Sequence, residues 1–322
     1  MKKLVSLLLC LIAITSCDKI KVPDQRPPQV YNCIDTTKNV VISSNSTYTP
    51  SINLNKRRVL LEDYTGHQCV NCPRAAEQAE ALAAQYGDQL VVIANHVSDF
   101  AAPNRNPVDA RYAENFKNDA STEWDKVFGM SNAGLPQGSI NRTSGPNYPM
   151  LLTKWPSLMP DAINKPQVAR IDIITYNDTL NHYLTAKVKT TFKTAYSNNV
   201  NLIVILTQDS ITGEQKDGKP PASSQLDSIE PGFRINYRFD NIVIGSINGT
   251  WGQLVKAAPI AVNYDTTLVN SCYKIDKCFE TSPNKVCLKY DYINIVAFIY
   301  DVTTYEVLQV EKMRIKPTKV KD

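Results

Sequence analysis

The stretch that decides the fold is Tyr64-Thr65-Gly66-His67-Gln68-Cys69-Val70-Asn71-Cys72-Pro73. A short β-prone run, Arg58 to Tyr64, leads into it. Behind it, apolar residues recur at helical spacing from Ala75 to Tyr86, where Gly87 ends the pattern. Gln89 to His96 is then typical of a buried strand. The order strand, C-x-x-C, helix, strand predicts a βαβ unit with the first cysteine at the N-terminus of the helix.

The place of the first cysteine predicts its chemistry. Free main-chain amides and the dipole at a helix N-terminus stabilise a thiolate and lower the pKa of a cysteine there. We therefore expect Cys69 to be the more exposed and the more acidic thiol of its pair. A C-x-x-C pair alone also fits a structural disulfide or half of a zinc site. Zinc is the weakest of the three interpretations, because no second C-x-x-C follows and His67 is its only support.

The chain resembles thioredoxin-fold proteins at three further points. Those proteins carry a buried acid six residues before the first cysteine, where this sequence has Asp63. They also carry a cis-proline after a glycine, which faces the dithiol, and Gly134-Leu135-Pro136 fits that pattern. The resemblance implies that Cys69 attacks, Cys72 resolves the mixed disulfide, Asp63 relays a proton and Pro136 lines the substrate groove. Gln68 and Val70-Asn71 depart from the usual tryptophan and Gly-Pro, so the resemblance does not carry over a redox potential.

The first residues predict export and a lipid anchor. Lys2-Lys3 precedes an apolar segment, Leu4 to Thr15, that is too short to span a bilayer as a helix. The segment ends in Ile14-Thr15-Ser16-Cys17, which resembles a bacterial lipobox. We expect residues 1–16 to be a lipoprotein signal peptide and Cys17 to be acylated, with an ordinary cleaved leader as the alternative. Residues 17–55 then form a proline-containing tether and N-terminal segment.

Composition and pattern predict two domains after the tether. The chain has 322 residues, is 43% hydrophobic and 20% charged, and carries a net charge of +4 with no basic stripe, so nucleic acid is not an expected partner. Residues 56–165 are expected to form an α/β thioredoxin-like domain. Its helical insertion is predicted over Val108–Phe116 and Thr122–Phe128, and its closing helix over Met150–Ile163, interrupted at Pro156.

Residues 166–322 read as an all-β, immunoglobulin-like sandwich. The expected strands are rich in Val, Ile and Thr and are separated by turns, one of them from Gly213 to Pro221. They run over 168–176, 183–192, 200–208, 234–247, 292–301 and 307–315. Four more cysteines, Cys33, Cys272, Cys278 and Cys287, are candidates for one or two structural disulfides whose connectivity the sequence leaves open.

Taken whole, the chain resembles a family of Bacteroidetes outer-membrane lipoproteins, the outer-membrane-protein-twenty-eight-like family. The resemblance rests on the lipobox, on the Tyr-Thr-Gly-x-x-C-x-x-C-Pro stretch at Tyr64 to Pro73, and on the softer segments Gly245 to Gly252 and Val296 to Glu311. It implies an outer-membrane location, lipid-anchored and either periplasmic or surface-exposed. It implies little about activity.

A tripeptide that marks O-glycosylation in that phylum, Asp-[Ser/Thr] followed by an aliphatic residue, Met or Thr, recurs in the chain. Its acceptors would be Thr36, Thr179, Ser210, Ser228 and Thr266. The alternative is that these Asp-Ser and Asp-Thr pairs are ordinary turn formers in a β-rich chain.

Two functions of different classes remain open. The chain is either a thiol–disulfide oxidoreductase acting on protein thiols and disulfides, or a non-catalytic binding or assembly lipoprotein that recruits envelope proteins and keeps Cys69–Cys72 as a structural disulfide. The sequence does not decide whether it is an enzyme. No nucleophile elbow, phosphate-binding loop or dinucleotide fingerprint is present, so no cofactor is expected.

Overall fold

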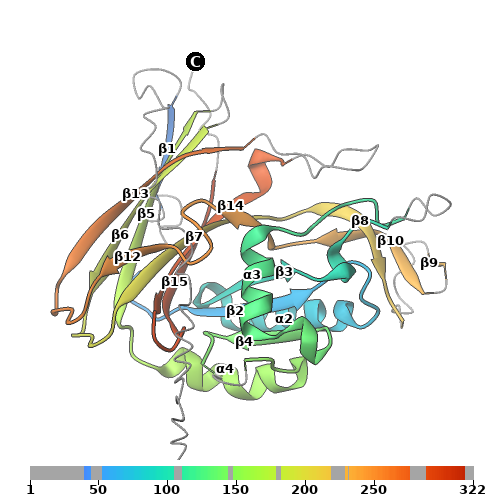
Figure 1. The fold of residues 1–322 in the computed structure, drawn as a ribbon, viewed down its shortest axis with the longest axis horizontal. Helices are drawn as coiled ribbons and strands as arrows, with labels where there is room; N and C mark the ends of the chain where they lie inside the picture. The colour runs from blue at the N-terminus through green and yellow to red at the C-terminus, as the bar shows by residue number, and fades with distance from the viewer. Residues whose placement is uncertain are drawn as a thin grey trace, which may run out of the picture.

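The computed structural model describes residues 40–44, 53–104, 111–143, 148–178, 183–218, 229–230, 232–275 and 288–315. This part of the chain is mostly β, with a few helices and mixed sheets (Figure 1). In chain order it contains β1 (Val40–Ser44), β2 (Val59–Thr65), α2 (Cys72–Tyr86), β3 (Leu90–His96), α3 (Asp119–Phe128), β4 (Gln137–Ile140), α4 (Trp155–Asn164), β5 (Ala169–Asp178), β6 (Tyr183–Phe192), β7 (Val200–Gln208), β8 (Ile211–Lys216), β9 (Ile229–Glu230), β10 (Phe233–Phe239), β11 (Ile242–Ser246), β12 (Gln253–Lys256), β13 (Asp265–Lys274), β14 (Ile293–Asp301) and β15 (Val307–Arg314).

One large mixed sheet runs through the centre of the molecule in the order β15-β14-β7-β11-β3-β2-β4, with β12 also paired to β7. β2 and β3 are parallel, and β4 is antiparallel to β2. β11 links the two halves, because it pairs with β3 on one side and with β7 on the other. The sheet therefore contains strands from both sides of residue 165, where the sequence predicts a domain boundary.

Three layers cover this sheet. A second sheet, β1-β5-β6-β13, packs on the β7 and β14 half, and the two share a core of alternating aliphatic residues such as Ile171, Val188, Val204 and Ile295. On the opposite face of that half, Trp124 of α3 packs with Ile205 and Phe298. α2 and α4 cover the other face of β2, β3 and β4. Alternation along each strand sends successive side chains into different layers.

A buried ion pair fastens β2 to the segment after β4. Arg142 donates to both carboxylate oxygens of Glu62, from Nε at 2.8 Å and from Nη2 at 2.7 Å. The Arg142 guanidinium lies over the rings of Trp124, Phe128 and Phe298. Both charged side chains are fully buried. Such a pair stabilises the fold only while both partners are present.

A third, smaller sheet in the order β8-β10-β9 projects from the central sheet (Figure 1). It is an extension of the β7–β11 hairpin: β7 continues into β8, and β10 continues into β11. We call β8 and β10 together the arm. The turn predicted from Gly213 to Pro221 is wrong over Gly213 to Lys216, which belong to β8, and the single strand predicted over 234–247 is divided into β10 and β11. Left-handed backbone at Ser210 and Asn241 bends each connection, so the arm leaves the plane of the central sheet.

Two helix predictions also need correction. Residues 111–118, within and just beyond the helix expected over Val108–Phe116, are not helical, and Tyr112 has φ 58°. Asn118 caps α3 by accepting a hydrogen bond from the Ser121 main-chain N–H, so the helix begins at Asp119. In α4, Pro156 lies in the first turn, where proline is tolerated, and does not interrupt the helix.

Candidate functional site

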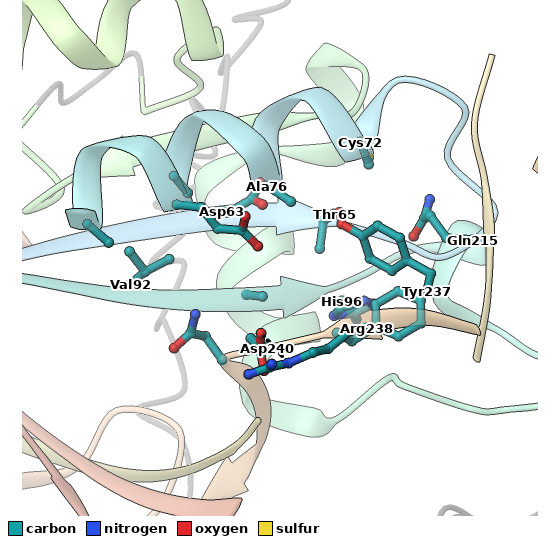
Figure 2. A pocket seen from close by; sticks show the side chains of 16 residues that line it. Asp63, Thr65, Cys72, Ala76, Val92, His96, Gln215, Tyr237, Arg238 and Asp240 are labelled. Atoms are coloured by element: carbon teal, nitrogen blue, oxygen red, sulfur yellow. Dashed lines mark hydrogen bonds and ion pairs between the residues drawn. The ribbon is translucent and has the colours of Figure 1, made fainter. Parts of the chain in front are cut away.

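Strand alternation places the acid of the candidate site beneath the C-x-x-C helix. In β2, Val59 and Leu61 pack against the layer formed by α2 and α4, so Asp63 and Thr65 point to the same side. β3 runs parallel, with Asp63 paired to Ala94 and Thr65 paired to His96. The ends of these strands therefore bring Asp63, Thr65 and His96 onto the face that α2 covers (Figure 2).

Cys69 and Cys72 form a disulfide, with their Cα atoms 5.4 Å apart. The sequence predicts that Cys69 lies at the N-terminus of the helix. In the structure α2 begins at Cys72, and Cys69 lies in the loop three residues before it. Both cysteines are buried in the disulfide form, at 3% and 1% exposure respectively, and the greater exposure and acidity expected of the Cys69 thiol stay predictions. No side chain caps the helix and no acid lies in its first turn, so nothing there offsets the positive end of the helix dipole, which favours a thiolate at Cys72. The main-chain N–H groups of Cys72 and Arg74 themselves donate to the carbonyls of Cys69 and Asn71.

Gly66 explains why the loop before Cys69 can be covered so closely. A Cβ atom at this position would lie 2.6 Å from the main-chain carbonyl of Phe100. The same Phe100 carbonyl accepts a hydrogen bond from the Gln68 main-chain N–H at 3.0 Å. The segment around Phe100 therefore packs directly on the loop, which only glycine permits.

Asp63 lies in a cavity of about 90 Å³ that Cys72 also lines. Burial raises the pKa of the Asp63 carboxyl from 3.8 to about 8. Its Oδ1 atom has no hydrogen-bond partner in the described structure. Ala76, Ala79 and Ala83 of α2 supply small side chains along the same wall, which leaves the space open. At neutral pH the cavity that Cys72 lines therefore holds a protonated carboxyl.

Two buried histidines flank this region. His67 donates from Nε2 to the Ala102 carbonyl at 3.0 Å, and burial lowers the pKa of His67 to about 4. Burial, and then the neighbouring His67, lower the pKa of His96 to about 3. Phe116 lies between them, with ring centroids 5.1 Å from each. Both imidazoles are consequently neutral at physiological pH.

The arm closes the site from the far side. Lys216 of β8 donates its main-chain N–H to the His67 carbonyl at 2.7 Å, and Gly218 donates to the Val70 carbonyl at 3.1 Å. The Gln215 amide donates to the Cys69 carbonyl at 3.1 Å. From β10, Tyr237 extends into the cavity toward β2 (Figure 2). Residues about 150 positions away in the sequence thus form one wall of the dithiol site.

The structure brings together some of the residues predicted from the sequence. The Leu135–Pro136 peptide bond is cis. Gln137 pairs with Tyr64, so Pro136 comes just before β4, at the edge of the sheet where β2 ends. Cys69, Cys72 and Asp63 lie in the same region. Their catalytic roles, and that of Pro136, stay predictions.

Other predicted residues fall outside this site. Cys17, Cys33, Thr36, Thr179, Ser228, Cys278 and Cys287 lie outside the described residues, and Cys272 lies on β13. Ser210 is half-buried at the base of the arm, and Thr266 is half-buried on β13. Glycosylation at these positions and the downstream disulfides stay predictions.

Sequence reasoning missed His96, Gln215 and Tyr237. His96 could have been found, since it ends a predicted strand parallel to the one that carries Asp63. Gln215 and Tyr237 had no local signal, because only the tertiary path of the arm brings them to the cysteines. Among the described residues, no group of three or more His, Cys, Asp or Glu side chains is arranged to hold a metal ion. Within that same part of the chain, no helix is long and apolar enough to span a membrane.

The fold and site define a β-rich protein with a buried C-x-x-C disulfide at the start of a helix. No protein-family model matches the chain. A search of curated proteins likewise finds no match.

Among solved structures, the chain is similar to HBP35 of Porphyromonas gingivalis, with a TM-score of 0.52 and 15% identity over 83% of this chain and 79% of that one. A domain of the outer membrane lipoprotein Omp28 from the same organism matches with a TM-score of 0.29 and 16% identity, over 46% of this chain and 88% of that one. A protein from Agrobacterium tumefaciens matches with a TM-score of 0.46 and 10% identity, over 83% and 98%. The first likeness is one of fold alone, and the other two scores are too low to support an argument.

Proposed function

We propose that this chain is a lipid-anchored thiol–disulfide oxidoreductase of the outer membrane, with a thioredoxin-like unit over residues 56–165 and an immunoglobulin-like sandwich over 166–322. The observation that carries the proposal is the Asp63 carboxyl. It is buried, one of its oxygens is unpartnered, and it shares a cavity with Cys72. Burying a carboxyl in this way costs free energy without improving packing, and such groups concentrate at sites of proton transfer.

The proposed reaction transfers two electrons from a partner dithiol to the Cys69–Cys72 disulfide. A partner thiolate attacks Sγ of Cys69, the Cys69–Cys72 bond breaks, and a mixed disulfide forms between the partner and Cys69. Cys72 leaves as a thiolate, stabilised by the dipole at the N-terminus of α2, and takes the proton of Asp63. The partner's second thiolate then attacks the partner sulfur that is bonded to Cys69, which releases the oxidised partner and the Cys69 thiolate.

The location in the proposal rests on the sequence. The lipobox at Cys17 and the tether that follows place the folded part beside a membrane, and the family resemblance points to the outer membrane. In an oxidising compartment the resting form of the pair is the disulfide, as in this structure. An oxidant of partner dithiols needs no dedicated reductant, which favours this direction.

A second function is favoured by one specific observation. Both sulfur-bearing residues are buried under the arm, at 3% and 1% exposure, as a permanent structural bridge would be. In that case the chain is a non-catalytic binding or assembly lipoprotein that recruits envelope proteins. The two functions differ in whether the disulfide exchanges with a partner.

The deciding experiment is thiol exchange with a reduced, unstructured dithiol peptide. We expect the oxidised chain to gain two thiols while the peptide forms its disulfide, measured by acid quenching, alkylation and mass spectrometry. A Cys72→Ser variant should trap oxidised peptide as a mixed disulfide on Cys69, and Cys69→Ser/Cys72→Ser is the matched control. Absence of exchange and of trapping, at peptide concentrations where a small dithiol does reduce the bridge, would establish the second function instead.

A further inference from the structure

The arm meets the C-x-x-C loop as an extended strand would meet a partner strand. Lys216 and Gly218, two residues apart on one edge, donate their main-chain N–H groups to the carbonyls of His67 and Val70, on either side of Cys69. Between them, the Asp217 carboxylate accepts from Arg74 Nη2 of α2 at 2.7 Å. The end of β8 and the two residues that follow it, Gln215 to Gly218, are called the tip of the arm below.

The tip also contacts the cysteines themselves. The Gln215 amide donates to the Cys69 carbonyl, and its side chain lines the cavity with Cys72. Gly218 passes so close to Val70 that a Cβ atom there would lie 2.8 Å from Val70 Cγ2. A nucleophile that approaches Cys69 from this side therefore meets the tip.

The tip and the base of the arm are held by different forces. At the base, Ile211 and Phe239 of the arm pack with Phe116 and Ile242 in a small apolar core. The two connections also bind each other there, because Ser210 N–H donates to Asp240 and Asn241 N–H donates to Asp209. Apolar burial and crossed hydrogen bonds therefore anchor the base.

At the tip, polar contacts make most of the attachment. Arg234 of β10 donates to Asp217 from Nε at 2.7 Å and to Glu77 from Nη2 at 3.1 Å. Arg74 and Glu77 of α2 are 36% and 41% exposed, so water competes for the α2 side of this ion network, while Asp217 and Arg234 are 1% and 8% exposed. A strand anchored by an apolar base and attached by a partly hydrated polar tip can lift from the tip without unfolding the protein.

We propose that the arm is an intramolecular cover of the Cys69–Cys72 disulfide, and that thiol exchange requires its tip to lift. The cover regulates the site described under the proposed function and rests on that function for its purpose. It occupies the surface that a partner's extended segment would use, through main-chain amides and an acidic side chain. Exchange by any thiol is then governed by the fraction of molecules in which the tip is open.

The test measures opening and reactivity on the same full-length protein. Reduction by dithiothreitol breaks the Cys69–Cys72 bond and leaves two protein thiols and cyclic oxidised reagent, so its rate is read by quenched alkylation. Opening is read by hydrogen exchange at the main-chain amides of Lys216 and Gly218. Asp217→Lys removes the acceptor of Arg74 and Arg234 and places a third cation beside them. Loss of these charged hydrogen bonds should increase both rates about ten- to hundredfold.

Two further variants keep the test decisive. Gln215→Ala leaves the ion network intact and should increase both rates by a smaller and mutually equal factor, even if Asp217→Lys fails to fold. Asp161→Lys makes the same charge change on exposed α4 and should alter neither rate. An unchanged reduction rate in a folded Gln215→Ala or Asp217→Lys variant, despite faster amide exchange, would overturn the cover. Because dithiothreitol needs no partner, faster reduction without oxidation of the dithiol peptide would refute the proposed function and leave the cover standing.

Discussion

Replacing Asp63 with asparagine tests the electrostatic centre of the site. Burial raises the pKa of this carboxyl from 3.8 to about 8 in the folded chain. A group whose folded pKa is raised contributes stability below its unfolded value, and that stability is lost as the pH rises through the folded value. Each pH unit between about 4 and 8 therefore costs the folded state about 1.4 kcal/mol through Asp63 alone.

Between about pH 4 and 8, burial of Asp63 lowers the unfolding free energy by about 5 to 6 kcal/mol in total. Asparagine cannot ionise, but its amide NH2 brings one more donor into the buried site than the protonated carboxyl has, and an unpartnered buried donor costs about 1–3 kcal/mol. Asp63→Asn should accordingly be less stable than the parent by about 2 kcal/mol near pH 4 and more stable by about 3 kcal/mol above pH 8. The sign of its effect reverses within the window.

The assay is urea unfolding of both oxidised proteins at half-unit steps from pH 4 to 9. The difference in unfolding free energy between the two proteins cancels the histidines and every other titrating group that the substitution leaves unchanged. It should rise with pH up to about 8 and then level off. Asp161→Asn, an exposed acid on α4, should give a flat difference. A flat difference for Asp63→Asn as well would show that Asp63 ionises normally, and the argument for proton transfer would fail with it.

Four other changes have definite expected outcomes. The pKa values of His96 and His67 are lowered to about 3 and about 4, so the stability that these neutral imidazoles contribute is complete above pH 6.5 and is lost as the pH falls. His96→Phe should therefore reduce the loss of unfolding free energy between pH 6.5 and 4. Urea midpoints that fall as far as in the parent would contradict this. Glu62→Ala leaves the buried Arg142 guanidinium without its ion-pair partner and should lower the unfolding free energy by about 3–5 kcal/mol. Glu62→Met/Arg142→Met should lose less stability than the single substitution. The Cys69–Cys72 disulfide closes only a very short loop, so Cys69→Ala/Cys72→Ala should melt near the parent, whereas removing Cys272, Cys278 and Cys287 should lower the Tm by several degrees. The reverse order would mark the C-x-x-C bridge as the structural one. Cys17→Ser should move the protein from the membrane to the soluble fraction, and mass spectrometry that finds an unmodified Cys17 in the parent would refute the anchor.

Local patterns predicted the elements that carry the cysteines. The strands β2 and β3 and the helix α2 lie within a few residues of their predicted limits, because each depends on a hydrophobic period that the sequence displays. The limits of β6 and β7 were predicted as they stand in the structure, Tyr183–Phe192 and Val200–Gln208. Asp63 was chosen by its distance from Cys69 in the sequence, and strand alternation brings it under α2.

Non-local contacts decided what could not be predicted. Gly213 to Lys216 fall within the turn predicted from Gly213 to Pro221, but pairing with β10 makes them part of a strand. A single β11–β3 pair, Ile242 with Ala94, joins two halves that the sequence divides at residue 165. Of the helix expected over Val108–Phe116, the described residues 111–116 are not helical, because Phe116 packs between two histidines and that contact outweighs helical propensity.

The cover and the buried acid depend on one another. Tyr237 and Gln215 of the arm line the cavity that holds Asp63, so the arm contributes to the burial that raises the pKa of this carboxyl. In the proposed open form, water would enter the cavity, the penalty on the charged carboxylate would fall, and Asp63 would release its proton more readily. The same movement gives a partner thiolate access to Cys69. Proton supply to Cys72 and access to Cys69 would thus be coupled, and the closed form would hold a disulfide that is protected from thiols in the surrounding compartment.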